Sequence, residues 1–113
     1  MIRHIVLFQF RTDLDEAAIG TLFAELHEIE GKIPGLLSIT SGRSESPEQM
    51  ERGYMHGFVA DFSDWAALQA YQDNAQHQAV GAKLSAASIG GKDGIVCFDL
   101  HMASSTTKGG AGR

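Results

Sequence analysis

Residues 2–10 of this 113-residue chain read Ile2-Arg3-His4-Ile5-Val6-Leu7-Phe8-Gln9-Phe10. β-branched and aromatic side chains dominate the segment, which predicts a β-strand buried on both faces. Because side chains alternate along a strand, His4, Val6, Phe8 and Phe10 would share one face, opposite Ile5, Leu7 and Gln9. A strand that is apolar on both faces needs a covering layer on each side, and this requirement shapes the architecture expected for the rest of the chain.

A helix is expected after this strand. Asp13 is suited to cap its first turn, with Glu16 three residues further on as in a capping box. Apolar residues recur at helical steps of three and four: Ala18, Leu22, Leu26, Ile29 and Ile33. The pair Pro34-Gly35 ends this pattern.

Two more strands are expected in the middle of the chain, over residues 36–42 and 53–62, separated by a polar loop. Alternation in the later strand groups one set of side chains on a single face: Tyr54, His56, Phe58, Ala60 and Phe62.

Two short helices and a last strand follow. Asp64 is expected to cap the first helix and Asn74 the second, which would run over residues 75–87. A glycine-rich turn at 90–94 then leads to a strand over 95–100. The segment 103–113 consists mainly of Ser, Thr and Gly, and we expect it to be a disordered tail.

The element order β-α-β-β-α-β predicts an α+β, ferredoxin-like fold: two interleaved crossovers that form a four-stranded antiparallel sheet with helices on one face. The first and third strands are apolar on both faces, yet the helices can cover only one of them. A second copy of the sheet would cover the other. We therefore expect a homodimer formed through the open sheet face, which amounts to a dimeric α/β barrel.

Composition narrows the class of protein. The length supports one domain, residues 1–102, followed by the tail. A net charge of -5 with scattered basic residues argues against nucleic-acid binding. The first residues are too interrupted for a signal peptide, and no segment has the apolar length of a membrane span. Cys97 is the only cysteine, which fits a reducing compartment. The expected location is the cytoplasm.

The segment Tyr71-Gln72-Asp73-Asn74-Ala75-Gln76-His77 joins the two short helices. Tyr71 follows Leu68 by three residues, and His77 precedes Val80 by three, so both polar-tipped side chains should lie on the apolar faces of their helices. Such a pair is either a hydrogen-bonded tie within the core or an acid–base pair in a pocket.

Four quoted segments resemble the stress-responsive dimeric α/β barrel (Dabb) family. They are Met1-Ile2-Arg3-His4-Ile5-Val6-Leu7-Phe8, Lys32-Ile33-Pro34-Gly35-Leu36, Arg52-Gly53-Tyr54-Met55-His56 and the Tyr71…His77 segment. The layout is also similar to that of olivetolic acid cyclase, a plant polyketide cyclase. This resemblance implies a catalytic base at His77, a carbonyl-orienting partner at Tyr71, and pocket-lining histidines at His4 and His56. One departure is Asn74-Ala75-Gln76, where the family usually has His-Pro-Ala.

The chemistry available to His77 and Tyr71 is proton transfer next to a carbonyl. A neutral imidazole can accept a proton near neutral pH, and a phenol hydroxyl can donate to a developing oxyanion. An enzyme of this kind would be a cyclase or lyase acting α to a carbonyl. Phe8, Phe58 and Trp65 would form an apolar wall suited to an aromatic or acyl-chain carbonyl ligand. The alternative function is a non-catalytic, stress-associated dimer that confers stability or binds a ligand.

Other hypotheses about the function and about single residues have weaker support from the sequence. We expect no metal site, because no histidine pair has the spacing of a dedicated one. We expect no cofactor either; a haem-degrading monooxygenase-like activity remains a remote alternative that rests on fold analogy, with Trp65 more typical of a core residue. Cys97 reads as a small core residue, and His27 and His101 as solvated.

Overall fold

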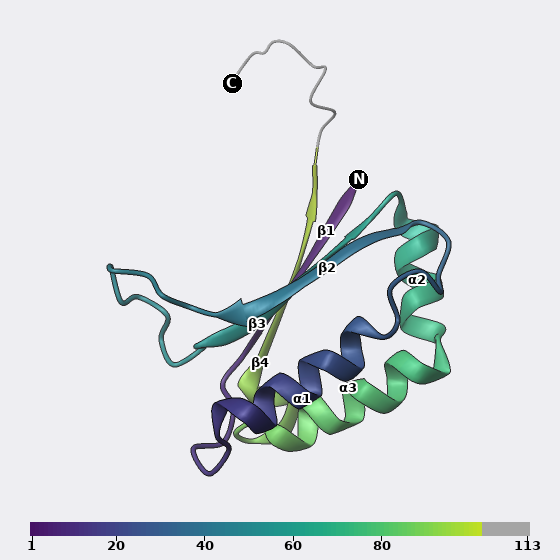
Figure 1. Ribbon diagram of the computed structural model, residues 1–113. Helices are drawn as coiled ribbons and strands as arrows, with labels where there is room; N and C mark the ends of the chain where they lie inside the picture. Colours follow the sequence, from purple (N-terminus) through teal and green to yellow (C-terminus); the bar gives the residue numbers. More distant parts are fainter. Residues whose placement is uncertain (103–113) are drawn as a thin grey trace, which may run out of the picture.

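The computed structural model describes residues 1–102, and the expected tail at 103–113 lies outside the described residues. Its elements follow the order β-α-β-β-α-α-β (Figure 1). The strands are β1 (Ile2–Phe8), β2 (Leu36–Arg43), β3 (His56–Phe62) and β4 (Ile95–His101). The helices are α1 (Glu16–His27), α2 (Trp65–Asp73) and α3 (Ala75–Ala87), with a 3₁₀ turn at Gly91–Gly94 before the last strand.

The strands form one antiparallel sheet in the order β2-β3-β1-β4. All three helices lie on the same side of it, so the domain has two layers (Figure 1). This is the ferredoxin-like α+β fold that the element order predicted. The third strand begins at His56 rather than at residue 53, because Arg52 and Gly53 both adopt positive φ angles, 57° and 92°, in the turn before it.

The core lies between the sheet and the helices. Even-numbered residues of β1 and β3 point towards the helices, and those with apolar side chains are buried: Ile2, Val6, Phe8, Phe58, Ala60 and Phe62. The helices contribute the opposing layer, chiefly Ile19, Phe23, Leu26, Leu68, Tyr71, Val80 and Leu84. Burial of each large side chain contributes roughly 1.5–3 kcal/mol, which makes this face the main source of stability.

Side-chain caps fix the helix starts. Asp64 accepts a hydrogen bond from the Ala67 amide, and Asn74 accepts one from the His77 amide, as predicted. The prediction for α1 was wrong, because the cap is Asp15, whose carboxylate accepts from the Ala18 amide at 2.8 Å. Asp13 is instead held by the Arg11 guanidinium at 3.0 Å.

The buried stripe of α1 also differs from the one expected. The helix ends at His27, so Ile29 and Ile33 are buried from the turns that follow it. Within the helix the fully buried residues are Ile19, Phe23 and Leu26, whereas the expected Ala18 and Leu22 are only half-buried. The expected stripe was therefore one residue too early at Ala18 and Leu22 and correct at Leu26.

The second sheet face is not covered within the single chain. On this face the edge strand β4 exposes Val96, Phe98 and Leu100, with 40%, 57% and 41% of their surfaces accessible. Leu7 in the neighbouring strand is exposed as well. Large contiguous apolar areas are rare on monomeric proteins.

Among residues 1–102, none of the helices combines the length and apolar character that crossing a membrane requires.

Candidate functional site

Tyr71 and His77 meet where α2 ends and α3 begins. Their ring centroids are 3.9 Å apart with an interplanar angle of 38°. Asn74 sets this geometry from both sides: its amide donates to the Tyr71 carbonyl, and its side chain accepts from the His77 amide at 2.9 Å. The corner therefore holds the two rings together without any hydrogen bond between their polar atoms.

Both rings carry a buried polar atom without a partner. Within residues 1–102, neither the Tyr71 hydroxyl nor His77 Nδ1 has a hydrogen-bond partner, although the Tyr71 side chain is fully buried. Burial, followed by the nearby Cys97, raises the pKa of Tyr71 above its usual value. Burial, followed by the charge of His4, lowers the pKa of His77 below 6.5. At neutral pH the pair is thus a protonated phenol beside a neutral imidazole.

His4 closes the site from the sheet side. Its ring lies 5.9 Å from that of Tyr71, edge-on, and is itself buried. Nδ1 of His4 is 2.5 Å from a carboxylate oxygen of Asp99, the residue opposite it on β4. A carboxylate accepts, so Nδ1 of His4 carries the hydrogen and Nε2 is left as the free acceptor when the ring is neutral.

Cys97 lies beside this pair, because residues 97 and 99 share one face of β4. Its Sγ is 3.7 Å from His4 Nδ1. Donor atoms of His4, Cys97 and Asp99 all lie within 4.8 Å of one another, and imidazole, thiolate and carboxylate are donors that zinc accepts. In the structure the His4–Asp99 hydrogen bond uses two of these groups. Burial, followed by the Asp99 charge, raises the pKa of the Cys97 thiol, so the thiol stays protonated.

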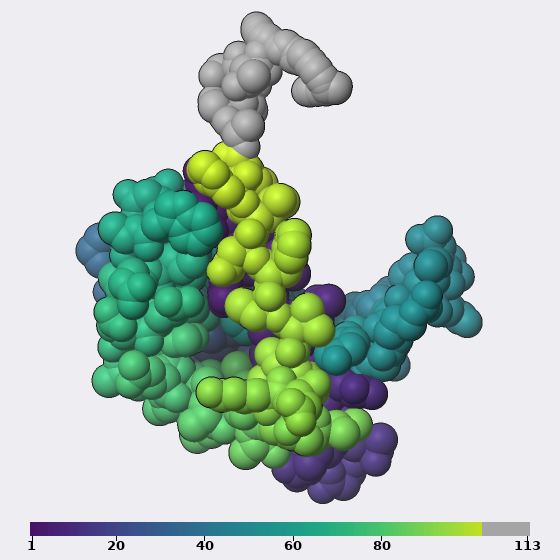
Figure 2. All heavy atoms as spheres, turned by 180° about the vertical axis from the view of Figure 1, so that it is seen from behind, coloured from purple at the N-terminus to yellow at the C-terminus, as the bar shows by residue number. Residues whose placement is uncertain are grey.

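The expectation that Cys97 is a core residue was wrong, since it is exposed. Strand β4 is one of the two edge strands, and most of its residues are exposed. Figure 2 shows a hollow between the teal and green helices α2 and α3 and the yellow strand β4, with purple atoms of β1 at its floor. The strand register places Cys97 and Asp99 on the same sheet face as His4.

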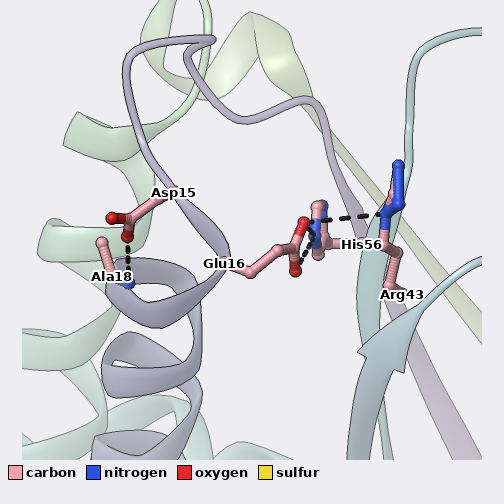
Figure 3. A network of polar contacts seen from close by, with 5 residues as sticks. All are labelled: Asp15, Glu16, Ala18, Arg43 and His56. Carbon is pink, nitrogen blue, oxygen red and sulfur yellow. Dashed lines mark hydrogen bonds and ion pairs between the residues drawn. The ribbon is translucent and has the colours of Figure 1, made fainter.

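His56 is located at the other end of the same sheet face. Its Nε2 lies 3.0 Å from both carboxylate oxygens of Glu16, and the Arg43 guanidinium approaches that carboxylate at 3.6 Å (Figure 3). Glu16 is in the first turn of α1, just after the Asp15 cap, so the contact ties the helix start to the sheet. His56 is paired with Phe8 across the strands, whereas His4 is paired with Ala60.

The aromatic residues expected to line a pocket fill the space between the two histidines. Phe58 lies 5.9 Å from the rings of both His4 and Phe8, and Phe8 stacks on Phe10 at 4.9 Å. Trp65 does not join them. It is 53% exposed, so it is not the core residue expected, and its ring packs near His101 at 6.1 Å. The structure therefore groups His4 with Tyr71 and His77, and sets His56 and Trp65 apart.

A cavity of about 340 Å³ adjoins the His56 end, between α1 and β2. Its walls include Glu16, Phe23 and His56, together with His27. His27 is not simply solvated, because its ring nitrogens contact Glu30 and Ser41 at 2.8 Å. His101 is exposed, as expected.

Asp99, Cys97 and Glu16 are the site residues that the sequence interpretation missed. A signal was available for the first two, because residues two apart on an edge strand share a face and can lie opposite a histidine on the neighbouring strand. The contact between Glu16 and His56 could not be predicted, because it depends on where α1 begins and the helix cap was assigned to the wrong residue.

The fold and this arrangement define a class, the ferredoxin-like α/β barrel proteins. Comparison with known proteins narrows it: the sequence model of the stress responsive A/B barrel domain (Dabb) matches residues 2–102, and the chain belongs to this family. No curated protein sequence matches the chain.

Solved structures show the same fold. A dimeric ferredoxin-like protein of unknown function from Jannaschia sp. CCS1 is 32% identical, with a TM-score of 0.84, and the match covers 89% of this chain and 98% of that one. Hydroxynitrile lyase from Passiflora edulis is 17% identical, with a TM-score of 0.78 and coverage of 92% and 94%. SnoaB, a cofactor-independent oxygenase from Streptomyces nogalater, is 13% identical, with a TM-score of 0.72 and coverage of 95% and 97%.

Proposed function

We propose that this protein is an enzyme that moves a proton at the carbon next to a carbonyl group, with His77 as the base and Tyr71 as the donor to the carbonyl oxygen. The observation that carries the proposal is the adjacent pair of buried, unpartnered polar atoms on these two residues. An unsatisfied buried polar group costs about 1–3 kcal/mol, so two neighbouring ones call for an explanation, and a carbonyl ligand supplies it.

The protonation states suit this step. A neutral His77 has a lone pair on Nδ1 when its hydrogen is on Nε2, and its lowered pKa keeps that form dominant at neutral pH. The raised pKa of Tyr71 keeps its hydroxyl protonated. In the reaction the α-carbon–hydrogen bond breaks, the proton passes to His77, and the electron pair forms an enolate whose oxygen accepts from Tyr71. Return of the proton from His77 to the carbon completes the turnover. Alternatively, the enolate attacks a second carbonyl, a carbon–carbon bond forms, and the resulting alkoxide takes the proton back from His77.

His4 and Asp99 support the pair from the sheet. The carboxylate fixes the His4 tautomer and compensates its charge when it is protonated. A charged His4 in turn lowers the pKa of His77 and helps keep it neutral. His4 therefore acts as a wall of the site and as an electrostatic control on the base.

The ligand proposed is a small aromatic or acyl-chain carbonyl compound. Phe58 and Phe62 flank the His4 ring and offer apolar contact on the inner side of the site. Two proteins of this fold are named as enzymes, a hydroxynitrile lyase and a cofactor-independent oxygenase, so the fold is compatible with an enzymatic role.

Exchange of α-hydrogens in D₂O tests the proposal without knowledge of the full reaction. Aryl methyl ketones and acyl thioesters are incubated with the protein, and loss of the α-proton signal is followed by NMR. The proposal expects catalysed exchange with at least one compound and its loss in His77→Ala. His56→Ala is the matched control, because it removes a buried histidine from the other end of the same sheet face. Equal exchange by wild type and His77→Ala would refute the assignment of the base.

The open sheet face supports a second part of the proposal, that the chain forms a homodimer through this face. The exposed apolar residues of β4 lie on it, and the relative with 32% identity is described as dimeric. Analytical ultracentrifugation of the wild type tests this directly, and His77→Ala should leave the dimer intact because His77 lies on the other side of the sheet.

A further inference from the structure

Three side chains of types that bind metal ions converge at the β4 edge of the inner sheet face. His4 Nδ1, Cys97 Sγ and a carboxylate oxygen of Asp99 all lie within 4.8 Å of one another. Within residues 1–102 they are the one set of three histidine, cysteine or carboxylate donors that is grouped this closely. The proposed proton transfer uses His4 and Asp99 as supports and gives Cys97 no role, so it does not account for the whole group.

The pairing of β1 with β4 brings the three donors together. Cys97 and Asp99 are two residues apart on β4, so their side chains point to the same face of the sheet. His4 lies directly opposite Asp99 on β1, and its buried ring is on this face too. Because paired strands rather than loops carry all three residues, their donor atoms are held close together before any ion binds, which lowers the cost of binding one.

The distances between the donors fit tetrahedral coordination after one small movement. With the usual zinc bond lengths, tetrahedral nitrogen and sulfur ligands lie ~3.6 Å apart, and nitrogen and oxygen ligands ~3.3 Å apart. His4 Nδ1 and Cys97 Sγ are already 3.7 Å apart. The Asp99 oxygen is 2.5 Å from Nδ1 and must move away by about 0.8 Å. Asp99 is exposed, so a rotation of its side chain can supply this movement.

The types of donor favour zinc over the common hard cations. Magnesium and calcium prefer oxygen ligands, whereas imidazole nitrogen and thiolate sulfur are ligands of zinc. On binding, the S–H bond of Cys97 breaks and its proton passes to solvent. A neutral His4 ring keeps one hydrogen, which moves from Nδ1 to Nε2 by exchange with solvent. One thiolate and one carboxylate then balance the two charges of the ion, so the partly buried site is neutral.

We propose that His4, Cys97 and Asp99 bind one Zn²⁺ ion per chain, with a water molecule in the fourth position. Three protein ligands and one open position are typical of zinc sites that exchange a ligand, rather than of closed structural sites. The spacing of histidines along the sequence gave no reason to expect a metal, because His4 is 93 and 95 residues away from the other two ligands. The proposal does not depend on the proton-transfer reaction, since metal binding is measured without a substrate.

Cobalt is the probe for the first test, because Co²⁺ accepts the ligands of zinc and its bond to a thiolate absorbs in the near ultraviolet. Titration of the metal-free protein with Co²⁺ should produce this band at one ion per chain, and Zn²⁺ should remove it. Cys97→Ser should abolish the band. Asp99→Asn keeps an oxygen that accepts from His4 but loses the charge, and it should weaken binding about ten-fold or more.

His56→Ala is the matched control, because it removes the other histidine–carboxylate pair, and Cys97 is the only cysteine of the chain. This variant should give the band at the same Co²⁺ concentration as the wild type. A folded wild type without the band would overturn the proposal. Zinc binding of equal affinity in Cys97→Ser would overturn it as well, because it would show adventitious binding by other side chains.

The tautomer of His4 provides a second test, which does not rely on cobalt. In the metal-free protein the ring hydrogen is on Nδ1, where Asp99 accepts it. Saturation with Zn²⁺ should move the hydrogen to Nε2, and long-range ¹H–¹⁵N NMR of the ring distinguishes the two forms. A ring that keeps its hydrogen on Nδ1 would contradict the proposal. His77→Ala should show the same change as the wild type, so the metal site and the proposed reaction can fail separately.

Discussion

The two ends of the inner sheet face each bury a histidine that pairs with a carboxylate, but the surroundings of the two pairs differ. His56 is satisfied by Glu16 at 3.0 Å, with Arg43 nearby, and the contact anchors the start of α1. At the other end His4 is satisfied by Asp99, while the neighbouring Tyr71 hydroxyl and His77 Nδ1 have no partner in the described chain. A histidine–carboxylate pair is therefore a structural contact at one end, whereas at the other end it lies beside two polar atoms with unused hydrogen-bonding capacity.

This difference separates stability from function. A buried group that is already paired contributes to folding, and its removal should lower the free energy of unfolding. A buried group that is unpaired lowers stability unless a ligand pairs it, so its removal should affect activity more than folding. Substitutions at the two ends should therefore differ in their effects on stability and on catalysed exchange.

The largest expected effect is on the base. His77→Ala should reduce α-hydrogen exchange by about 100-fold or more, since general-base catalysis contributes roughly 10²–10⁴ in rate. The melting temperature should change little, because the Nδ1 atom makes no hydrogen bond in the described chain. Exchange kinetics and differential scanning calorimetry on the same samples measure both. A protein that loses its fold along with its activity would show that His77 is structural.

Removal of the Tyr71 hydroxyl should lower the exchange rate and raise the stability of the fold. Tyr71→Phe should slow exchange by about 100-fold, in the range found for loss of one oxyanion donor. The ring stays packed and an unpaired hydroxyl disappears, so the free energy of unfolding should rise by up to about 1 kcal/mol. Urea denaturation measures this change. A decrease in stability would show that the hydroxyl has a partner in the folded protein.

Substitution of His56, at the other end of the sheet face, should lower stability and leave the exchange rate nearly unchanged. His56→Ala removes a nearly buried ring and its contact with Glu16, and it should lower the free energy of unfolding by about 2 kcal/mol. The exchange rate per folded molecule should stay within about three-fold of the wild type, a margin well under 1 kcal/mol. A large loss of exchange in this variant, with the fold intact, would show that His56 belongs to the same functional site as His77.

A smaller effect should appear in the pH dependence of stability. The pKa of folded His77 lies below its unfolded value of about 6.5, so protonation favours the unfolded chain. The contribution of neutral His77 is complete above about pH 6.5 and is lost as the pH falls from there through the lowered pKa of the folded state. His77→Gln lacks this titration, and its unfolding free energy should fall less than that of the wild type over the same range. Parallel curves would contradict the lowered pKa.

Much of the fold follows from local sequence signals. The polar caps Asp64 and Asn74 and the alternation in the first and third strands correctly located α2, α3 and the buried face of β3. Asp13 and Asp15 are both residues of a type that caps helices; in the structure Asp15 accepts from the Ala18 amide, and Asp13 pairs with Arg11. Cys97 looked buried because its neighbours are apolar, but exposure depends on how far the helices reach over the edge strand, which no local pattern records.

The candidate site was predictable in part for the same reason. The spacing around the α2–α3 corner placed Tyr71 and His77 on the inner faces of their helices. The separation of His4 from His56 required the strand register, and the role of Asp99 required β4 to be paired with β1. These are contacts between distant parts of the chain, and propensities read along the sequence do not contain them.

The role of His77 as a ligand-binding base can be tested by NMR pH titration of the histidine side chains, with and without aryl ketones and acyl thioesters. We predict that His77 titrates below pH 6.5 and that its signals shift with one class of carbonyl ligand, while those of His56 do not respond to the ligand. A His77 that shows no titration between pH 5 and 9 and no response to any of these compounds, with a hydrogen-bonded Nδ1, would contradict it.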